Sequence, residues 1–132
     1  MPSYILMLQT DADDRFITES TISEIGYDVP LKFLEEAGKL DEYVGREGLP
    51  SLILLNDGGS ILQKKQLLRE FKSNPAYSHI PVIVLGEKST EAYIRECYRA
   101  GASSYITKPS SVKETKKKIE LFFAYWFDVA EI

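Results

Sequence analysis

Short continuous apolar runs alternate along this chain with longer segments in which apolar residues recur every three or four positions. A continuous apolar run is typical of a strand that is covered on both faces of a sheet. One weaker run, Val29–Leu34, contains Pro30, which cannot donate to a sheet ladder, so we expect this strand near an edge. The four clear strands are predicted at Tyr4–Leu8, Leu52–Leu55, Pro81–Leu85 and Ser104–Thr107.

The longer segments have the spacing and the end signals of amphipathic helices. The first begins in an acidic stretch and ends at Gly26. Its core candidates are Phe16, Ile17, Ile22 and Ile25. The other helices are predicted at Ala37–Gly45, after Gly58-Gly59-Ser60 to about Lys72, at Ser89–Ala100, and from Ser110 or Ser111 to about Phe127.

Five strands that alternate with five helices, joined by short loops, predict a single α/β domain over residues 1–132. Parallel strands need crossover connections, which place helices on both faces of the sheet. We therefore expect a three-layer α/β/α sandwich around a five-stranded parallel sheet.

Composition and charge narrow the class of partner. A hydrophobic content of 44% and a charged content of 27% are ordinary for a soluble globular protein. The net charge of −4 argues against nucleic acid, because phosphate binding favours a basic surface. No apolar run approaches the roughly 18 residues of a membrane span, and the N-terminus lacks an export signal. We expect a cytoplasmic protein with neither nucleic acid nor membrane as a partner.

Two residues that often carry chemistry have plain structural interpretations here. Cys97 is the one cysteine, so no intrachain disulfide is expected, and its place on a predicted helix favours a buried, inert thiol. His79 precedes a strand without an acidic or cysteine cluster at ligand spacing, so we expect a loop residue rather than a catalytic base or a metal ligand.

The residues that end the predicted strands point to a site scaffold without reactive carboxylates. The carboxyl ends of parallel strands converge on one crevice, where ligands and chemistry are placed. That crevice would receive Gln9 and Thr10 from the first strand, Asn56 from the third, Gly86 from the fourth and Lys108 from the fifth. No nucleophile–base pair or metal cluster is among them, so we expect no enzymatic activity.

Three segments, in their order along the chain, closely resemble the receiver domain of bacterial two-component response regulators, which has a flavodoxin-like fold. They are Pro50–Asn56, Ile80–Leu85 and Gly101–Pro109, the last with Lys108-Pro109 after an aromatic-containing strand. The ending Tyr125–Val129 is similar to the single-domain receivers grouped with phytochrome-associated response regulators. The resemblance implies a stand-alone receiver with no output domain.

The resemblance also implies a role for each position in the crevice. A working receiver accepts a phosphoryl group on an aspartate that ends the third strand, here Asn56. Two acidic residues that hold Mg²⁺ correspond to Gln9 and Thr10, and a hydroxyl residue corresponds to Gly86, while the phosphate-clamping lysine is retained as Lys108. Mg²⁺ prefers carboxylate ligands, so we expect its binding to be weak or absent, with no other cofactor. These replacements favour a pseudo-receiver that acts in a phosphorelay by protein–protein interaction, with a histidine kinase or another signalling protein as partner.

Two alternatives remain open. Asp57 adjoins the acceptor position and Asp11 adjoins the metal positions, so either could substitute in a receiver that is still phosphorylated with altered metal chemistry. We favour structural roles for both, Asp57 as a turn cap and Asp11 as a helix cap. The other alternative is a flavodoxin-like domain that binds a small anion or nucleotide at Lys108 and the helix N-termini.

Aromatic residues supply the candidates for a protein interface. Five aromatics fill six positions, from Phe122 to Phe127, and point around the whole helix, so one face cannot bury them all. They either pack over the end of the core or form a docking surface. The resemblance implies pairing through the fourth helix, fifth strand and fifth helix, so we expect a homodimer that forms without phosphorylation. The candidate contacts are Tyr98, Tyr105 at the aromatic switch position, Tyr125, Trp126 and Phe127.

Overall fold

The computed structural model describes residues 4–8, 12–26, 29–56, 61–86, 90–107 and 111–129. The strands are β1 (Ile5–Leu8), β2 (Leu31–Leu34), β3 (Leu52–Asn56), β4 (Val82–Gly86) and β5 (Ser104–Thr107). The α-helices are α1 (Ala12–Ile25), α2 (Leu40–Glu47), α3 (Ile61–Ser73), α4 (Glu91–Ala100) and α5 (Val112–Phe123). A 3₁₀ turn at Ala37–Lys39 precedes α2, and a π-helical segment at Ala124–Val129 continues α5.

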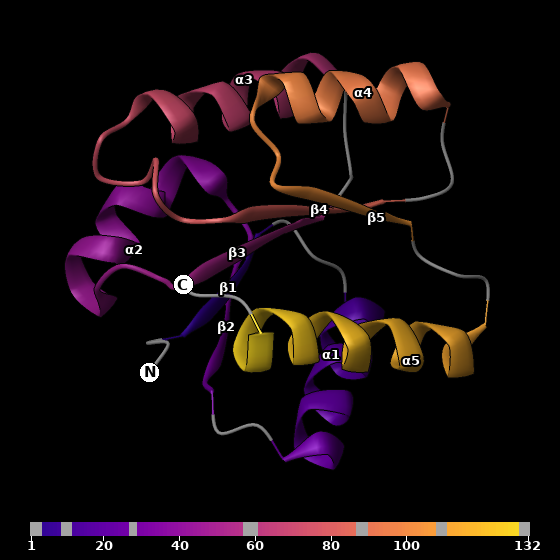
Figure 1. The fold of residues 1–132 in the computed structure, drawn as a ribbon. Helices are drawn as coiled ribbons and strands as arrows, with labels where there is room; N and C mark the ends of the chain where they lie inside the picture. The colour runs from indigo at the N-terminus through magenta and orange to yellow at the C-terminus, as the bar shows by residue number, and fades with distance from the viewer. Residues whose placement is uncertain are drawn as a thin grey trace.

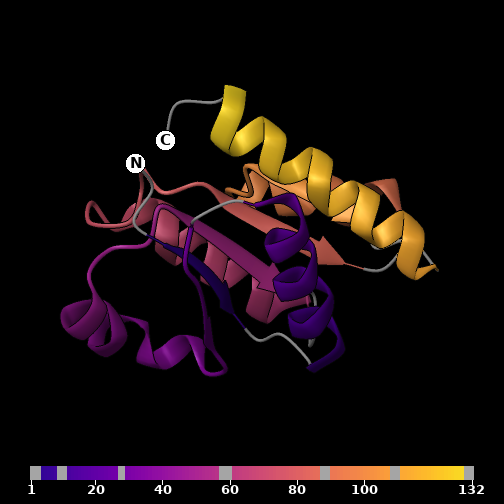
Figure 2. The same cartoon turned by 90° about the horizontal axis from the view of Figure 1, so that it is seen from below.

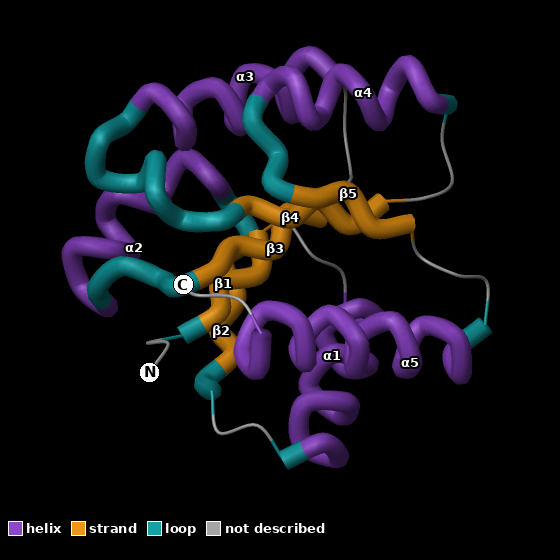
Figure 3. Tube along the Cα trace, viewed as in Figure 1, coloured by secondary structure: helices purple, strands orange, loops and turns teal. Residues whose placement is uncertain are grey.

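The five strands form one parallel sheet in the order β2-β1-β3-β4-β5 (Figure 3). The inner strands β1 and β3 bury every residue that they contribute, whereas β2 and β5 are half-buried along their length. This is the pattern expected when edge strands lie at both sides of a covered sheet. The predicted α/β architecture and the edge position of β2 are both confirmed.

Helices cover both faces of the sheet and create two separate cores. Figures 1 and 2 show α1 and α5 on one face, and α2, α3 and α4 on the other. Successive strand side chains point to opposite faces, so each strand contributes to both cores. Leu54 packs with Phe123 of α5 on the first face, while Leu55 packs with Leu68 of α3 and Cys97 of α4 on the second.

The helix α1 buries a different face from the one predicted. Phe16 is 72% exposed, so its assignment to the core is wrong, while Ile22 is buried and Ile17 and Ile25 are half-buried. The buried face instead includes Thr18 and Thr21, and the Thr21 hydroxyl donates to the Ile17 carbonyl at 2.8 Å. Because threonine reads as polar in a sequence pattern, the true buried face carried little apolar signal.

The helix α2 starts and ends later than predicted. The segment from Ala37 to Lys39 forms a 3₁₀ turn, and the α-helix runs past Gly45 to Glu47. Gly48 ends the helix at φ +88°, a backbone conformation that favours glycine, with its N–H donating to Val44 at 2.8 Å. Gly45 is therefore helical, and Gly48 is the stop.

The aromatic end of α5 mostly completes the core on the α1 side. Phe123 is 1% exposed, and Phe127 stacks on it with ring centroids 5.4 Å apart. Phe122 and Trp126 are half-buried against the same cluster, whereas Tyr125 is 53% exposed. The packing interpretation therefore holds for four of the five aromatics, and Tyr125 is the one left at the surface.

Gly101, which ends α4, offers a direct test of the packing between α3 and α4. Its φ is +125°, and a Cβ placed there would lie 2.3 Å from Cγ of Lys72 in the last turn of α3. We expect Gly101→Ala to lower the free energy of unfolding by about 1–3 kcal/mol, measured by urea denaturation.

Two further variants identify the cause. Adding Lys72→Ala should recover the part that comes from the contact and leave the part that comes from the backbone strain. Gly45→Ala is the matched control, because Gly45 is helical with open space around it and should gain about 0.5–1 kcal/mol. A neutral Gly101→Ala would contradict this description of the α4 terminus.

Candidate functional site

The carboxyl edge of the sheet brings together two of the predicted site positions. Asn56 ends β3 and pairs in register with Leu85 of β4, so it lies beside Gly86, which ends β4. Gly86 in turn pairs with Thr107, the last residue of β5. Asn56 is 9% exposed and Gly86 is buried. The crevice therefore receives an amide from β3 and no side chain from β4.

The other predicted site residues lie outside the described residues. They are Gln9, Thr10, Asp11, Asp57 and Lys108. Their assigned roles therefore remain predictions. The described strand ends that precede them, Leu8, Asn56 and Thr107, belong to one edge of the parallel sheet.

Within the described ranges, no three histidine, cysteine or acidic side chains gather closely enough to hold a metal ion. None of the described helices has the length and apolar character needed to cross a membrane. The described part of the crevice supplies neutral polar and apolar groups only.

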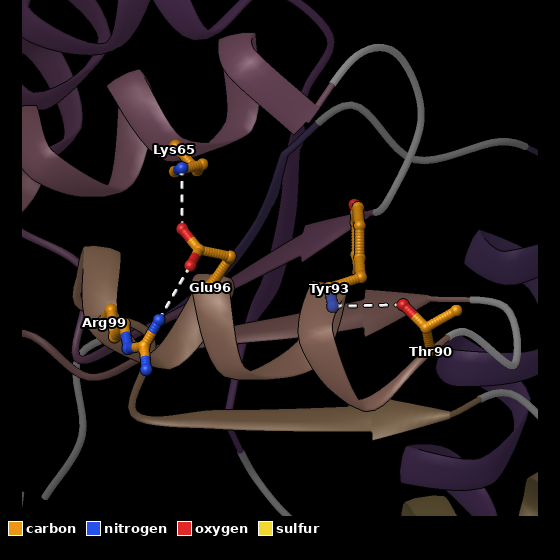
Figure 4. A network of polar contacts seen from close by, with 5 residues as sticks. All are labelled: Lys65, Thr90, Tyr93, Glu96 and Arg99. Carbon is orange, nitrogen blue, oxygen red and sulfur yellow. Dashed lines mark hydrogen bonds and ion pairs between the residues drawn. The ribbon is translucent and has the colours of Figure 1, made fainter.

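A charged network connects α3 to α4 (Figure 4). Lys65 of α3 lies 2.7 Å from one carboxylate oxygen of Glu96 on α4, and Arg99 donates to the other oxygen at 2.9 Å. The Lys65 ammonium and the Arg99 guanidinium together hold the pKa of Glu96 below its ordinary value of 4.5. At the start of α4, the Thr90 side chain accepts the N–H of Tyr93 at 3.1 Å and caps the helix.

Two tyrosines of α4 contact Tyr105 of β5, the residue predicted as an aromatic switch. The Tyr105 ring packs edge-to-face on Tyr93, with centroids 6.2 Å apart at 82°. The Tyr105 backbone N–H donates to the Tyr98 hydroxyl at 3.0 Å, and Tyr98 is 45% exposed. Burial raises the pKa of Tyr93 to about 12, so this ring stays neutral over the whole physiological range. The Tyr105 ring is thus half-buried between strand and helix.

A buried lysine at the α3–α4 contact was missed by the sequence reasoning. Lys64 is 3% exposed, and its positive charge acts on the nearby Cys97 thiol, which burial nevertheless gives a raised pKa. Cys97 itself is fully buried, as predicted. A signal was present in the spacing, because Lys64 falls four positions before Leu68 and seven before Phe71, both buried on α3.

Several known proteins are similar to this chain in sequence. No protein-family model matches the chain. The response regulator Rcp1 of Synechocystis sp. is 23% identical over 137 residues, covering 99% of this chain and 93% of Rcp1. The histidine kinase P4 of Formosa agariphila is 34% identical over 85 residues, which span 64% of this chain and only 6% of the kinase.

Solved structures share the whole fold. The Mn²⁺-bound form of Rcp1 aligns with a TM-score of 0.84 at 23% identity, covering 99% of each chain. The phosphorylated cyanobacterial phytochrome response regulator RcpA aligns with a TM-score of 0.79 at 21% identity, covering 98% of this chain and 97% of RcpA. These relatives and structural neighbours are response regulators of two-component signalling, some of them phytochrome-associated, and the chain shares their receiver fold.

The charged network predicts a specific dependence of stability on pH. Glu96 has a lowered pKa in the folded chain, so its contribution is present above about 4.5 and is lost as pH falls through the folded pKa. We expect Glu96→Gln to remove part of the stability that the wild type loses as the pH falls below about 4.5. Urea denaturation across this range measures the effect.

Glu91→Gln is the matched control on the same helix. Its carboxylate is 93% exposed and lies 3.6 Å from Arg95, so the pH profile should stay close to the wild type. Identical pH profiles for Glu96→Gln and the wild type would show that the network does not stabilise the α3–α4 contact.

Proposed function

We propose that this receiver works without aspartyl phosphorylation and signals through contacts with other proteins. The observation that carries the proposal is the amide of Asn56, buried at the carboxyl end of β3 and next to a glycine at the end of β4. In the receivers that the chain resembles, this pair of positions holds the acceptor carboxylate and the hydroxyl that contacts the new phosphoryl group.

The chemistry of an amide is unsuited to the acceptor role. An acyl phosphate forms when a carboxylate oxygen attacks phosphorus, and a neutral amide is a poor nucleophile. The attack also needs a metal ion to neutralise the approaching phosphate charge, and Mg²⁺ is held chiefly by carboxylates. Gln9 and Thr10 provide none at the positions that the resemblance assigns to the metal.

Two structural neighbours are known in a metal-bound or a phosphorylated form. Rcp1 was crystallised in a Mn²⁺-bound form and RcpA in a phosphorylated form. Our proposal is that this chain has kept their fold and lost both properties. It follows that the chain has no enzymatic activity and no resident metal.

Protein partners are the remaining route for signalling. Response regulators act with histidine kinases and other signalling proteins. One protein that is similar to part of this chain is itself a histidine kinase, P4. We propose a histidine kinase or another signalling protein of the cytoplasm as the partner. The α4–β5 contact made by Tyr93, Tyr98 and Tyr105 would present one fixed surface to it.

We also propose that the chain forms a symmetric homodimer through α4, β5 and α5. Leu121 and Tyr125 are 61% and 53% exposed and follow each other on the outer side of the last helix. A third exposed residue of this kind, Tyr98, lies on α4. Exposed aromatic and aliphatic anchors within a charged rim are typical of interface hot spots.

Treatment with acetyl phosphate and Mg²⁺ tests the central proposal. We expect intact mass spectrometry to show no stable phosphoryl adduct on the wild type, since no carboxylate occupies the acceptor position. An added phosphate that disappears in Asp57→Ala or Asp11→Ala would sink the proposal and establish the phosphorylatable alternative.

Restoring the acceptor alone should not restore phosphorylation. Asn56→Asp still lacks the two metal-binding carboxylates, so we expect an adduct only when Gln9 and Thr10 are also made acidic. The single Asn56→Asp variant is the matched control for the triple variant.

Sedimentation at micromolar concentration tests the dimer. We expect the wild type to sediment as a dimer, and Leu121→Glu with Tyr125→Ser to shift it towards the monomer by placing charge in the contact. Phe127 is unsuitable for this purpose because it stacks on the buried Phe123. Phe16→Ser, which removes a 72% exposed aromatic from α1, should leave the dimer intact. A monomeric wild type would refute the dimer and leave the phosphorylation result unaffected.

A further inference from the structure

A small apolar cavity lies between the sheet and the two helices that cover it, α1 and α5. Its volume is about 50 Å³. Its walls include Ile17 of α1, Leu54 and Leu85 of the sheet, and Ile119 and Phe123 of α5. The exposed wall is almost wholly apolar, so it offers few hydrogen-bond partners to water and favours an apolar occupant.

An open groove of about 640 Å³ runs outside the cavity, between β5 and the second half of α5. Tyr105, Leu121, Tyr125 and Trp126 line its outer part. Figures 1 and 2 show β5 and α5 beside each other at this edge of the molecule. The groove therefore combines aromatic walls with the exposed edge of the sheet.

The cavity and the groove are neighbours that share walls. Ile106, Thr107, Lys118 and Phe122 line both of them. Three of these shared residues offer apolar surface, and the fourth, Lys118, carries a positive charge on an aliphatic stem. The shared walls place one cation at the boundary between an apolar space and an open groove.

Lys118 is placed to receive an anion there. Its ammonium donates to the Thr107 carbonyl at 2.7 Å, which fixes the head group and uses one of its three donors. Lys118 is exposed, and α5 carries four lysines against two glutamates in a chain whose net charge is −4. Lys116 is paired with Glu24 at 3.0 Å, which leaves the positive charge of Lys117 beside Lys118.

We propose that the cavity and groove form one binding site for a soluble anionic amphiphile with an aliphatic chain. The chain end enters the cavity, the rest of the chain lies along Ile106 and Phe122, and the carboxylate of the ligand pairs with Lys118. The cavity exceeds the roughly 30 Å³ of one water in the liquid and is well below the ~150 Å³ that holds benzene. It therefore accepts an aliphatic end and excludes a ring.

This site goes beyond the proposed signalling function and involves neither Asn56 nor the metal positions. The observations that carry it are the shared walls and the fixed ammonium. A fatty carboxylate supplies both features that the site recognises, an apolar chain and one negative head group. Charge complementarity with α5 and the small volume of the cavity favour this class of ligand over a neutral or an aromatic one.

Titration of the full chain with octanoate, below its micelle-forming concentration, tests the proposal. Trp126 is the one tryptophan of the sequence and lines the groove, so its fluorescence reports occupancy, and calorimetry gives the stoichiometry. We expect saturable binding of one octanoate per chain. Affinity should rise about fourfold per methylene from hexanoate to octanoate, which is the transfer free energy of a buried CH₂ converted to a ratio. Octan-1-ol and acetate, which each lack one feature, should bind at least about tenfold more weakly.

Three variants locate the site. Lys118→Met keeps the aliphatic stem and removes the charge, so octanoate affinity should fall by about tenfold or more. Lys117→Met is the matched control, because Lys117 lines neither the cavity nor the groove, and its affinity should match the wild type within about twofold. Thr115→Leu places extra carbon atoms in the cavity wall and should abolish the gain with chain length. Circular dichroism confirms that each variant is folded.

Several results would overturn the proposal. Binding that does not saturate, or equal losses for Lys118→Met and Lys117→Met, would show a non-specific charge effect. Co-sedimentation with anionic phosphatidylglycerol vesicles without saturable octanoate binding would assign the patch to a membrane surface instead.

Discussion

The parallel sheet exposes no polar face, because β1 and β3 bury every residue that they contribute. Such a sheet is stable only when helices cover both of its sides, and crossover connections supply them. The two cores follow directly from this requirement, one under α1 and α5 and the other under α2, α3 and α4. The aromatic end of α5 helps to meet this requirement, because Phe123 and Phe127 complete the cover of the first face.

In this sheet the backbone determines where a site lies, and the side chains determine its chemistry. Parallel register places Asn56 beside Gly86 at one edge, whatever side chains those residues carry. Backbone geometry decides where the strand ends meet, while the residue types decide what chemistry can occur there. The contacts around α4 are built from different residues, namely the Lys65–Glu96 pair and the three tyrosines. These contacts do not involve Asn56, so the surface around α4 is maintained independently of the residue that ends β3.

The α5 side of the molecule joins three features in one place. The exposed Leu121 and Tyr125 form an outer surface, Lys118 fixes a positive charge at the end of β5, and the cavity lies beneath both. Leu121 and Tyr125 also line the groove beside Lys118, so the proposed protein contact and the proposed anion site share this surface.

The sequence by itself determined the fold class, the strand order along the chain and the identity of the residues at the strand ends, because apolar runs and helical spacing are local signals. It also placed β2 at an edge, through Pro30, and the buried Cys97. Only the tertiary structure showed that α1 buries Thr18 and Thr21 and exposes Phe16, since the choice of face depends on which side of the helix meets the sheet. The Lys65–Glu96 pair and the contact between Lys118 and Thr107 likewise required the packed structure. Each of these contacts joins two elements that only folding brings together, so no local sequence pattern predicts it.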